Sequence, residues 1–416
     1  MKIKELTNQE FDTFTSHYKE KSLFQTPEYG FVMNSQNYDS LFLGMTTDEG
    51  EIVAATLVLI ERLKGFKYAY APRGFLIDYQ NKEMLRAFTV LIKKYLGKKD
   101  VIAVKISPLI IKTIHDIKAK QKVENKNYDE IFQNLKSLGY FHHGYNFYFE
   151  AMKPRYEAIL DLQMQPEVLF QNFDKRIRTK IRSAVKNGIQ IYRGSKVNLK
   201  YLYLHTKKKY PRDLKYYEAC YEFFNKRKKI DFYYAKLDTQ VYLKLVQKNY
   251  EEAEKKAIDI EQLVVQNSGK NTQKIINKKI KIDNDYDLAK KNLITATKLL
   301  REFPDGLPLA SALVVKNQKE VYLLIDGFHT NYKSFNAKHL LLWKIIEKYS
   351  NEGFESFNLG GVSNPELVQN EFKGLNDFKL GFNPKVYEYI GDLELITNSA
   401  LYFLYRNSPK KGIFKR

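Results

Sequence analysis

Apolar residues recur with the periods of strands and helices through the first part of the chain. The runs Ile52–Glu61 and Tyr68–Ala71 have the content of two strands joined by a turn at Lys64-Gly65. The segment Glu83–Leu96 has apolar side chains three and four residues apart, which predicts an amphipathic helix. The run Val101–Ile106 then predicts a buried strand.

The same order of elements returns in the second half of the chain. Strands are predicted at Leu309–Val315 and Val321–Ile325, followed by a helix from Leu340 to Ile346 and a strand at Phe357–Leu359. Two copies of one unit predict a duplicated α/β (α+β) fold, and their order resembles the N-acetyltransferase-like fold. We therefore predict one such domain at residues 1–153 and a second at residues 154–240 and 302–416.

Residues 241–301 interrupt the second predicted domain. This segment is highly charged, and its small or apolar residues recur at three- and four-residue steps on both sides of a break at residues 267–271. The pattern predicts two long helices packed as an antiparallel coiled-coil hairpin. It leaves two roles open, a solvated structural arm and a lever that touches a nucleic acid or a membrane.

Composition adds a preference for anionic partners. The 416 residues include 69 Lys and Arg against 48 Asp and Glu, a formal charge of +21, which suggests phosphate-bearing or anionic-surface partners. The single cysteine, Cys220, excludes an internal disulfide, and the first residues show no sign of export, so we expect a cytoplasmic protein. No apolar run reaches membrane-spanning length, so contact with the inner face of the plasma membrane would be peripheral.

Three kinds of chemistry are not expected from this sequence. The histidines lack the spacing of metal ligands, and neither a G-x-S-x-G motif nor a cysteine–histidine constellation suggests a covalent acyl-enzyme. The loop after Ile325 lacks the glycine-rich turn that usually holds acetyl-CoA in acetyltransferase-like folds. We therefore predict no metal and no cofactor.

A helix predicted at Leu169–Lys186 carries a dense stripe of cations. Its apolar positions, among them Phe173, Ile177 and Val185, share one face, and Asn187-Gly188 would end it. Such a stripe can neutralise several phosphates, which favours RNA or anionic lipid over a merely solvated face. The cations are Lys175, Arg176, Arg178, Lys180, Arg182 and Lys186.

Two further stretches place cations beside aromatic residues. Arg212 and Tyr216 lie four apart, on one side of a helix if Pro211 opens it, and this pair can clamp a diphosphate. Pairing of Arg212 with a nearby carboxylate is the alternative. Lys379 lies between aromatic residues in Phe378–Pro384, before a Gly-aromatic-Asn-Pro turn. It is either a surface lysine with a packed stem or a cation at the mouth of a sheet.

Together these stretches resemble the FemABX family of tRNA-dependent peptidyltransferases, which build the side branches of peptidoglycan. An R-G-x-x-x-D-Y motif at residues 73–79 and an F-K-x-G-aromatic motif at residues 378–382 carry most of the resemblance. The segments Phe24–Thr26 and Arg155–Leu162, and Trp343 within its helix, add to it. The charged hairpin is similar to that of FemA- and FemB-type members.

The resemblance implies a twin acetyltransferase-like fold whose cleft holds a peptidoglycan precursor, either lipid II or UDP-MurNAc-pentapeptide. An aminoacyl-tRNA would supply glycine, alanine or serine to an amine of the stem peptide or growing branch, in cell-wall cross-bridge synthesis without metal or CoA. Because the ester is already activated, positioning plus a cation near the developing oxyanion would suffice. The amino acid, its place in the branch and the oligomeric state are left open.

The resemblance also assigns roles to single residues. Lys379 is the predicted catalytic cation, and Arg212 with Tyr216 would grip the diphosphate. Arg73 and Phe382 are further predicted substrate-binding residues, and the six cations of the basic helix are predicted to bind tRNA.

The sequence departs from the family pattern at one position. A lysine that family members often carry shortly after the Gln-Ser/Thr element aligns here with Met33.

Two competing functions stay open beside the aminoacyltransferase: a non-catalytic RNA- or membrane-binding protein on the same scaffold, and an aminoacyl-tRNA:protein N-terminal transferase.

Overall fold

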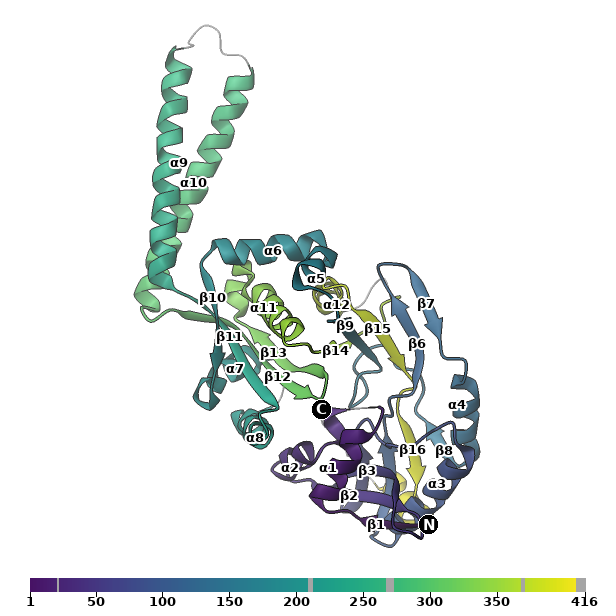
Figure 1. Cartoon of the computed structure of the whole chain (residues 1–416). Coiled ribbons are helices and arrows are strands. Elements are labelled where there is room, and N and C mark those ends of the chain that lie inside the picture. The colour runs from purple at the N-terminus through teal and green to yellow at the C-terminus, as the bar shows by residue number, and fades with distance from the viewer. Residues whose placement is uncertain (21, 209–211, 267–272, 368–370, 409–416) are drawn as a thin grey trace.

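The body of the molecule contains two mixed β-sheets with helices on their faces, and two long helices project from one end (Figure 1). The computed structural model describes residues 1–20, 22–208, 212–266, 273–367 and 371–408. The predicted α/β (α+β) class is confirmed. None of the helices in these ranges is long and apolar enough to cross a membrane.

The first sheet is built mainly from the N-terminal half of the chain. Its hairpin β3–β4 and its strand β5 match the predicted strands closely. Their apolar face packs against the helices α3 (Lys82–Gly97) and α4 (Tyr128–Ser137). In spatial order the described strands are β1 (Lys2–Glu5), β2 (Asp39–Thr46), β3 (Ile52–Leu63), β4 (Phe66–Ala71), β5 (Val101–Ile106), β16 (Leu393–Ile396) and β8 (Tyr140–His142).

The second sheet is larger and packs against the helix α11 (Ala337–Asn351), which fits the predicted helix through Leu340–Ile346. In spatial order its described strands are β10 (Ile189–Gly194), β11 (Ile230–Leu237), β12 (Leu307–Asn317), β13 (Glu320–Phe328), β14 (Ser356–Val362), β9 (Tyr156–Asp161), β15 (Lys385–Tyr389), β6 (Ile111–Asp116) and β7 (Gln121–Glu124).

Both sheets contain the same unit, an antiparallel hairpin followed by a parallel strand. The unit is β3–β4 with β5 in the first sheet and β12–β13 with β14 in the second. In the second sheet the parallel pairing covers only Glu320–Tyr322 against Ser356–Asn358. Beyond these residues the two strands diverge, which leaves their later residues free to line a cleft.

The two sheets exchange strands across the predicted domain boundary at residues 153 and 154. The hairpin β6–β7 precedes this boundary but pairs with β15 in the second sheet. The late strand β16 pairs with β5 and β8 in the first sheet. The domain limits stay a prediction, and each half completes the sheet of the other.

A third apolar cluster joins the two halves. It packs the helices α1 (Asn8–His17) and α2 (Pro27–Asn34) of the first half against α7 (Leu199–Thr206) and α8 (Leu214–Asn225) of the second, together with β11–β13. The remaining helices of the body are α5 (Pro166–Asn172), α6 (Lys175–Lys186), α12 (Lys373–Leu380) and α13 (Ser399–Asn407), and the 3-10 helices η1 (Leu23–Gln25), η2 (Lys196–Asn198) and η3 (Thr330–Phe335).

The prediction of one continuous helix over Leu169–Lys186 is wrong. The chain forms α5 and α6 instead, and Phe173 between them has an extended backbone. The break is stabilised from a distant segment, because the Asp174 amide donates a hydrogen bond of 2.9 Å to the Gly381 carbonyl. The end at Asn187-Gly188 is confirmed, with Gly188 at φ +74°.

The inserted segment forms two long helices that lie side by side and antiparallel (Figure 1). They are α9 (Thr239–Gln266) and α10 (Gln273–Glu302), so the two long helices predicted within residues 241–301 are present, whereas their coiled-coil packing and the limits of the insertion stay predictions. The predicted turn at residues 267–271 lies outside the described residues.

Candidate active site

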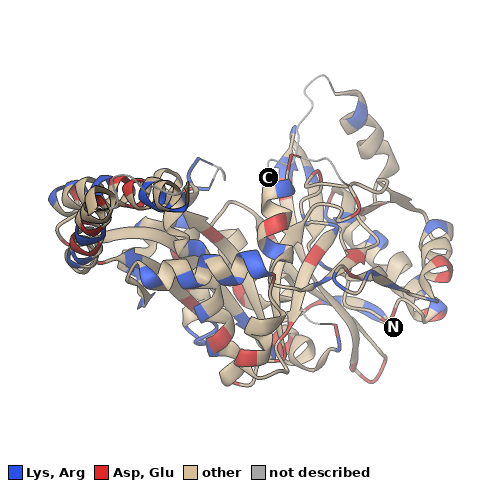
Figure 2. Cartoon of the chain, turned by 90° about the horizontal axis from the view of Figure 1, so that it is seen from above, with Lys and Arg blue, Asp and Glu red and all other residues tan. Residues whose placement is uncertain are grey.

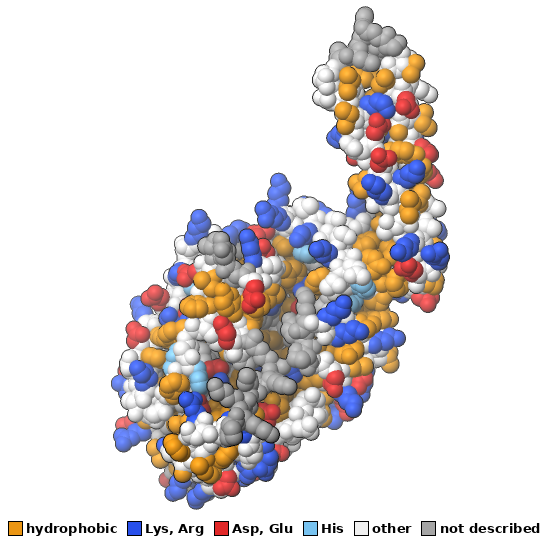
Figure 3. All heavy atoms as spheres, turned by 180° about the vertical axis from the view of Figure 1, so that it is seen from behind, with side chains coloured by type: hydrophobic (Ala, Val, Ile, Leu, Met, Phe, Trp, Pro, Cys, Tyr) orange, Lys and Arg blue, Asp and Glu red, His pale blue; other side chains and the backbone are white. Residues whose placement is uncertain are grey.

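A large cleft opens at the place where β13 and β14 diverge. Its volume is about 1960 Å³, and residues of both halves line it. From the second sheet come Leu323–Asp326 of β13 and Leu359–Gly361 of β14, and from the first half come Phe24, Tyr29 and Met33. The hollow is visible when the molecule is seen from behind (Figure 3). We call it the central cleft.

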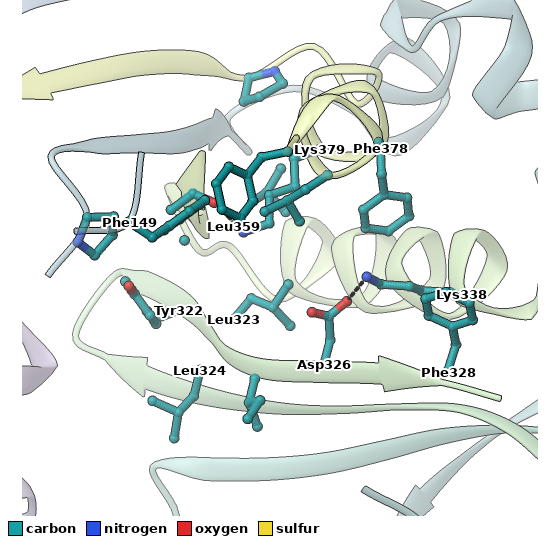
Figure 4. Close-up of a pocket in the computed structure, with 18 of the residues that line it drawn as sticks. Phe149, Tyr322, Leu323, Leu324, Asp326, Phe328, Lys338, Leu359, Phe378 and Lys379 are labelled. Carbon is teal, nitrogen blue, oxygen red and sulfur yellow. Dashed lines mark hydrogen bonds and ion pairs between the residues drawn. The ribbon is translucent and has the colours of Figure 1, made fainter. Parts of the chain in front are cut away.

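Lys379 lies in the last turn of α12, on the wall of the central cleft (Figure 4). Its side chain is only 7% exposed, and Nζ donates a hydrogen bond of 2.7 Å to the Gly361 carbonyl. Gly360 beside it has φ +75°, a conformation that suits glycine, and its amide donates to Asn358 Oδ1. The turn at Gly360 therefore fixes the Gly361 carbonyl, which in turn orients Lys379.

Burial changes the acid–base behaviour of this lysine. The loss of hydration lowers the pKa of Lys379 to about 8, while the nearby Asp326 acts in the opposite direction. Asp326 itself is paired with Lys338 of α11, with 2.5 Å between Oδ2 and Nζ (Figure 4). The Lys338 ammonium also lies 4.1 Å from the centre of the Phe378 ring. Sequence reasoning missed this pair, since its members lie twelve residues apart on a strand and a helix.

Arg212 and Tyr216 both line the central cleft, and the structure brings them into contact. The guanidinium carbon lies 4.1 Å from the centre of the Tyr216 ring. Helix α8 begins at Leu214, with Asp213 as its N-cap, and the predicted helix start at Pro211 lies outside the described residues. The described residues include every Asp and Glu of the chain, and none of them forms an ion pair with Arg212. The alternative that a carboxylate neutralises Arg212 is therefore wrong.

Arg73 is placed behind the cleft rather than on its surface. Its side chain is 3% exposed, and the guanidinium donates to Glu157 Oε1 at 2.6 Å and to the Pro154 carbonyl at 2.8 Å. Glu157 also accepts hydrogen bonds from Tyr322 and Asn358 of the second sheet. In this structure Arg73 therefore joins the two halves of the molecule, and its predicted contact with substrate stays a prediction.

Phe382 is likewise a core residue. It is fully buried, and its ring centre lies 5.0 Å from that of Phe173 and 5.5 Å from that of Phe378. Phe378 lines the central cleft, whereas Phe382 is not among the lining residues. The geometry gives Phe382 a supporting position beneath α12, and its predicted substrate contact stays untested.

The cations of α6 divide between the cleft and the outer surface. Arg176 and Lys180 line the central cleft. Figure 2, which looks down on the side of the molecule that carries α6, shows Lys and Arg positions on the helices there. The predicted apolar face is correct for Ile177 but wrong for Val185, which is 56% exposed. The break before Asp174 sets the phase of α6, so that Ala184 is buried instead. The outer cations are Lys175, Arg178, Arg182 and Lys186.

Lys153 was missed by sequence reasoning, although it lines the central cleft, as does Met33. It precedes β9, and its Nζ lies 3.2 Å from the centre of the Phe24 ring and 5.4 Å from that of Tyr29. Met33 is 6% exposed and belongs to the apolar cluster between the halves. Nothing local in the sequence marks Lys153, because the two rings near its ammonium, Phe24 and Tyr29, lie more than one hundred residues away along the chain.

Comparison with known proteins gives relatives over the whole length. The aminoacyltransferase FemA of Staphylococcus epidermidis is 26% identical over 424 residues, covering 99% of this chain and 99% of that protein. The lipid II:glycine glycyltransferase of the same species is 25% identical over 412 residues, covering 96% of this chain and 94% of that protein.

A solved structure and a family model agree with these relatives. The crystal structure of FemX shares the fold, with a TM-score of 0.73 and 24% identity over 97% of this chain and 99% of that one. Because the relatives are named transferases, the prediction of an enzyme of this class is confirmed. The model of the FemAB family matches residues 6–410, and the chain therefore belongs to the FemAB family.

Proposed function

We propose that this enzyme transfers an amino acid from aminoacyl-tRNA to an amine of a peptidoglycan precursor, in the synthesis of cell-wall cross-bridges. The observation that carries this proposal is a buried lysine, Lys379, fixed by the Gly361 carbonyl at the point where β13 and β14 diverge into the central cleft. The names of the relatives support a transfer of this kind onto lipid II.

The reaction needs little from the protein beyond position and charge. The acceptor amine nitrogen bonds to the ester carbonyl carbon, the bond from that carbon to the ribose oxygen breaks, and the amine loses a proton as the ribose hydroxyl gains one. Negative charge develops on the carbonyl oxygen during attack, and an ammonium group held nearby stabilises it. Lys379 is our candidate for this role, because the hydrogen bond to Gly361 orients it and the cleft walls remove most of its water.

The cations of the central cleft suggest how the two substrates are arranged. Arg176 and Lys180 come from α6, which packs beside α11, whereas Arg212 comes just before α8, which packs beside α2 (Figure 1). We call these two parts of the central cleft its α6 end and its α8 end. We assign the α6 end to the tRNA, whose phosphates the outer cations of α6 would also contact. The α8 end, with Arg212 and Tyr216, would receive the diphosphate of the acceptor.

An assay with charged tRNAs tests the proposal directly. The purified chain would be incubated with radiolabelled glycyl-, alanyl- or seryl-tRNA and with lipid II, UDP-MurNAc-pentapeptide or a peptide with a free N-terminus. Transfer to either precursor supports the proposal, and the two arms identify the acceptor. Transfer only to the peptide N-terminus would favour the N-terminal transferase, and binding of tRNA without transfer would favour a non-catalytic protein.

A further inference from the structure

The wall of the central cleft at the α8 end holds a second cation, Lys153, which forms no ion pair with any described residue. Lys153 is half-buried and lies over the Phe24 ring, with Tyr29 as its other aromatic neighbour. No carboxylate lies within ion-pair distance of its ammonium among the described residues, which include every Asp and Glu of the chain. A cation in such a place has lost water without gaining a counter-charge.

Arg212, which also lines the central cleft, is likewise a cation without a neighbouring counter-charge among the described residues. It stacks on Tyr216 and has no ion pair within the described part of the chain. Burial and the repulsion of Arg73 and Arg212 hold the pKa of Lys153 well below its usual value, and Lys153 and Arg212 both line the central cleft. Two unpaired like charges in an aromatic wall are costly unless an anion binds them.

The nearest acidic group cannot serve as that anion. Glu157 raises the pKa of Lys153, whereas burial and the two arginines lower it. Its oxygens already accept hydrogen bonds from Arg73, Tyr322 and Asn358. A bound anion would supply a counter-charge to both cations and would keep Lys153 in its charged form.

We propose that Lys153 and Arg212 form one anion site that binds the diphosphate of the acceptor, with Lys153 as a substrate-binding residue. This inference rests on the proposed function. The planar guanidinium suits paired contacts with phosphate oxygens, and the ammonium adds a point charge for the second phosphate. Met33, which also lines the central cleft, is apolar, so the charge comes from Lys153, three residues before β9, rather than from Met33 of α2.

The shared chemistry is a diphosphate diester, which can come from a lipid-linked or a nucleotide-linked precursor. Steady-state transfer would be measured for the wild-type enzyme and for Lys153→Gln, with lipid II and with UDP-MurNAc-pentapeptide in separate arms. A third arm would use a muramyl pentapeptide without phosphates. Lys93→Gln on the outer face of α3 removes the same charge from an exposed position and is the matched control.

We expect Lys153→Gln to raise the acceptor KM at least about tenfold in the diphosphate arm that the enzyme uses, which is about 1.4 kcal/mol of binding. The value of kcat and the KM for aminoacyl-tRNA should change less than about twofold. On the acceptor without phosphates, the variant and the wild type should behave alike. Lys153→Arg keeps the charge and should restore most of the affinity, which a purely structural role would not produce.

Three results would overturn the inference. An unchanged acceptor KM in a folded variant would remove Lys153 from the site, and an equal loss on the acceptor without phosphates would show a structural effect. A rise in the KM for aminoacyl-tRNA alone would assign Lys153 to RNA phosphates instead.

Failure of the proposed function gives a different result, in which the wild type transfers to no acceptor. Calorimetry with UDP and with pyrophosphate would then still test the site. Weaker binding to Lys153→Gln than to the wild type supports it, and equal or absent binding refutes it.

Discussion

Replacing Lys379 with methionine is expected to stabilise the folded protein while removing most of its activity. The wild-type lysine is 7% exposed, and burial lowers its pKa from 10.5 to about 8. This difference corresponds to about 3 kcal/mol of unfavourable free energy when the lysine is charged in both states. Methionine fills a similar space without charge, but it loses the hydrogen bond to Gly361, worth about 1 kcal/mol. The net gain near pH 7 is therefore about 2 kcal/mol.

The difference in stability between the wild type and Lys379→Met depends on pH. Between about pH 8 and pH 10.5 the unfolded chain holds a proton on Lys379 that the folded chain has released. The contribution of Lys379 to wild-type stability therefore rises with pH across this window, by about 3 kcal/mol in total. In Lys379→Met this contribution is absent, so its advantage over the wild type is largest below pH 8 and shrinks above it.

Urea unfolding of both proteins at pH 7, 8.5 and 10 measures this difference through the shift in midpoint. Lys93→Met, at an exposed position of α3, is the control and should follow the wild type at every pH. Parallel stability curves for the wild type and Lys379→Met across the window would refute the lowered pKa.

Transfer activity supplies the second readout for the same variant. Loss of the cation that stabilises the oxyanion should lower kcat about 10²- to 10³-fold. For the wild type, kcat/KM should fall as the pH rises through about 8, because the required ammonium loses its proton in the free enzyme. Retention of full activity in Lys379→Met would remove Lys379 from the reaction.

Three further variants test the tRNA end of the cleft, the joint between the halves and the turn beside Lys379. The double variant Arg176→Gln/Lys180→Gln should raise the KM for aminoacyl-tRNA and reduce the slope of log KM against log salt by roughly two, and an unchanged slope would contradict phosphate contacts there. Glu157→Gln leaves Arg73 buried without its counter-charge and should destabilise the fold by about 3–5 kcal/mol in urea unfolding, whereas a loss below about 1 kcal/mol would show that the pair is dispensable. Gly360→Ala forces a side chain into φ +75°, with its Cβ 3.6 Å from the Lys379 ammonium. We expect the free energy of unfolding to fall by about 1–3 kcal/mol and kcat to fall as well. Wild-type values for both would argue against a strained turn.

Local patterns were sufficient where one segment decides its own structure. The hairpin β3–β4, the helices α3 and α11 and the paired helices α9 and α10 all follow from apolar periodicity and turn residues, and they appear where the pattern placed them. The repetition of the unit also indicated the duplicated fold. Local patterns failed at Phe173, where a continuous helical period hides a break that a carbonyl from Gly381 stabilises.

Some contacts of the site follow from residues close together in the sequence, and others join segments that are far apart. Arg212 and Tyr216 are four residues apart, so their contact follows from local spacing. The burial of Arg73 depends on Glu157, eighty-four residues away along the chain, and that distance explains why the motif alone suggested a substrate contact. The pair of Lys338 and Asp326 depends on how α11 packs against β13, which no periodicity records.

The sequence by itself determined the repeated α/β unit, the helical hairpin, the excess of cations and, through its motifs, the family. Only the tertiary structure decided that β6–β7 and β16 complete the sheet of the other half, that β13 and β14 diverge, and that Lys379 and Lys153 lie on the wall of one cleft. The physical reason is the range of the interactions: periodicity and turn preference act within a few residues, whereas burial, ion pairing and strand exchange join residues up to about three hundred positions apart.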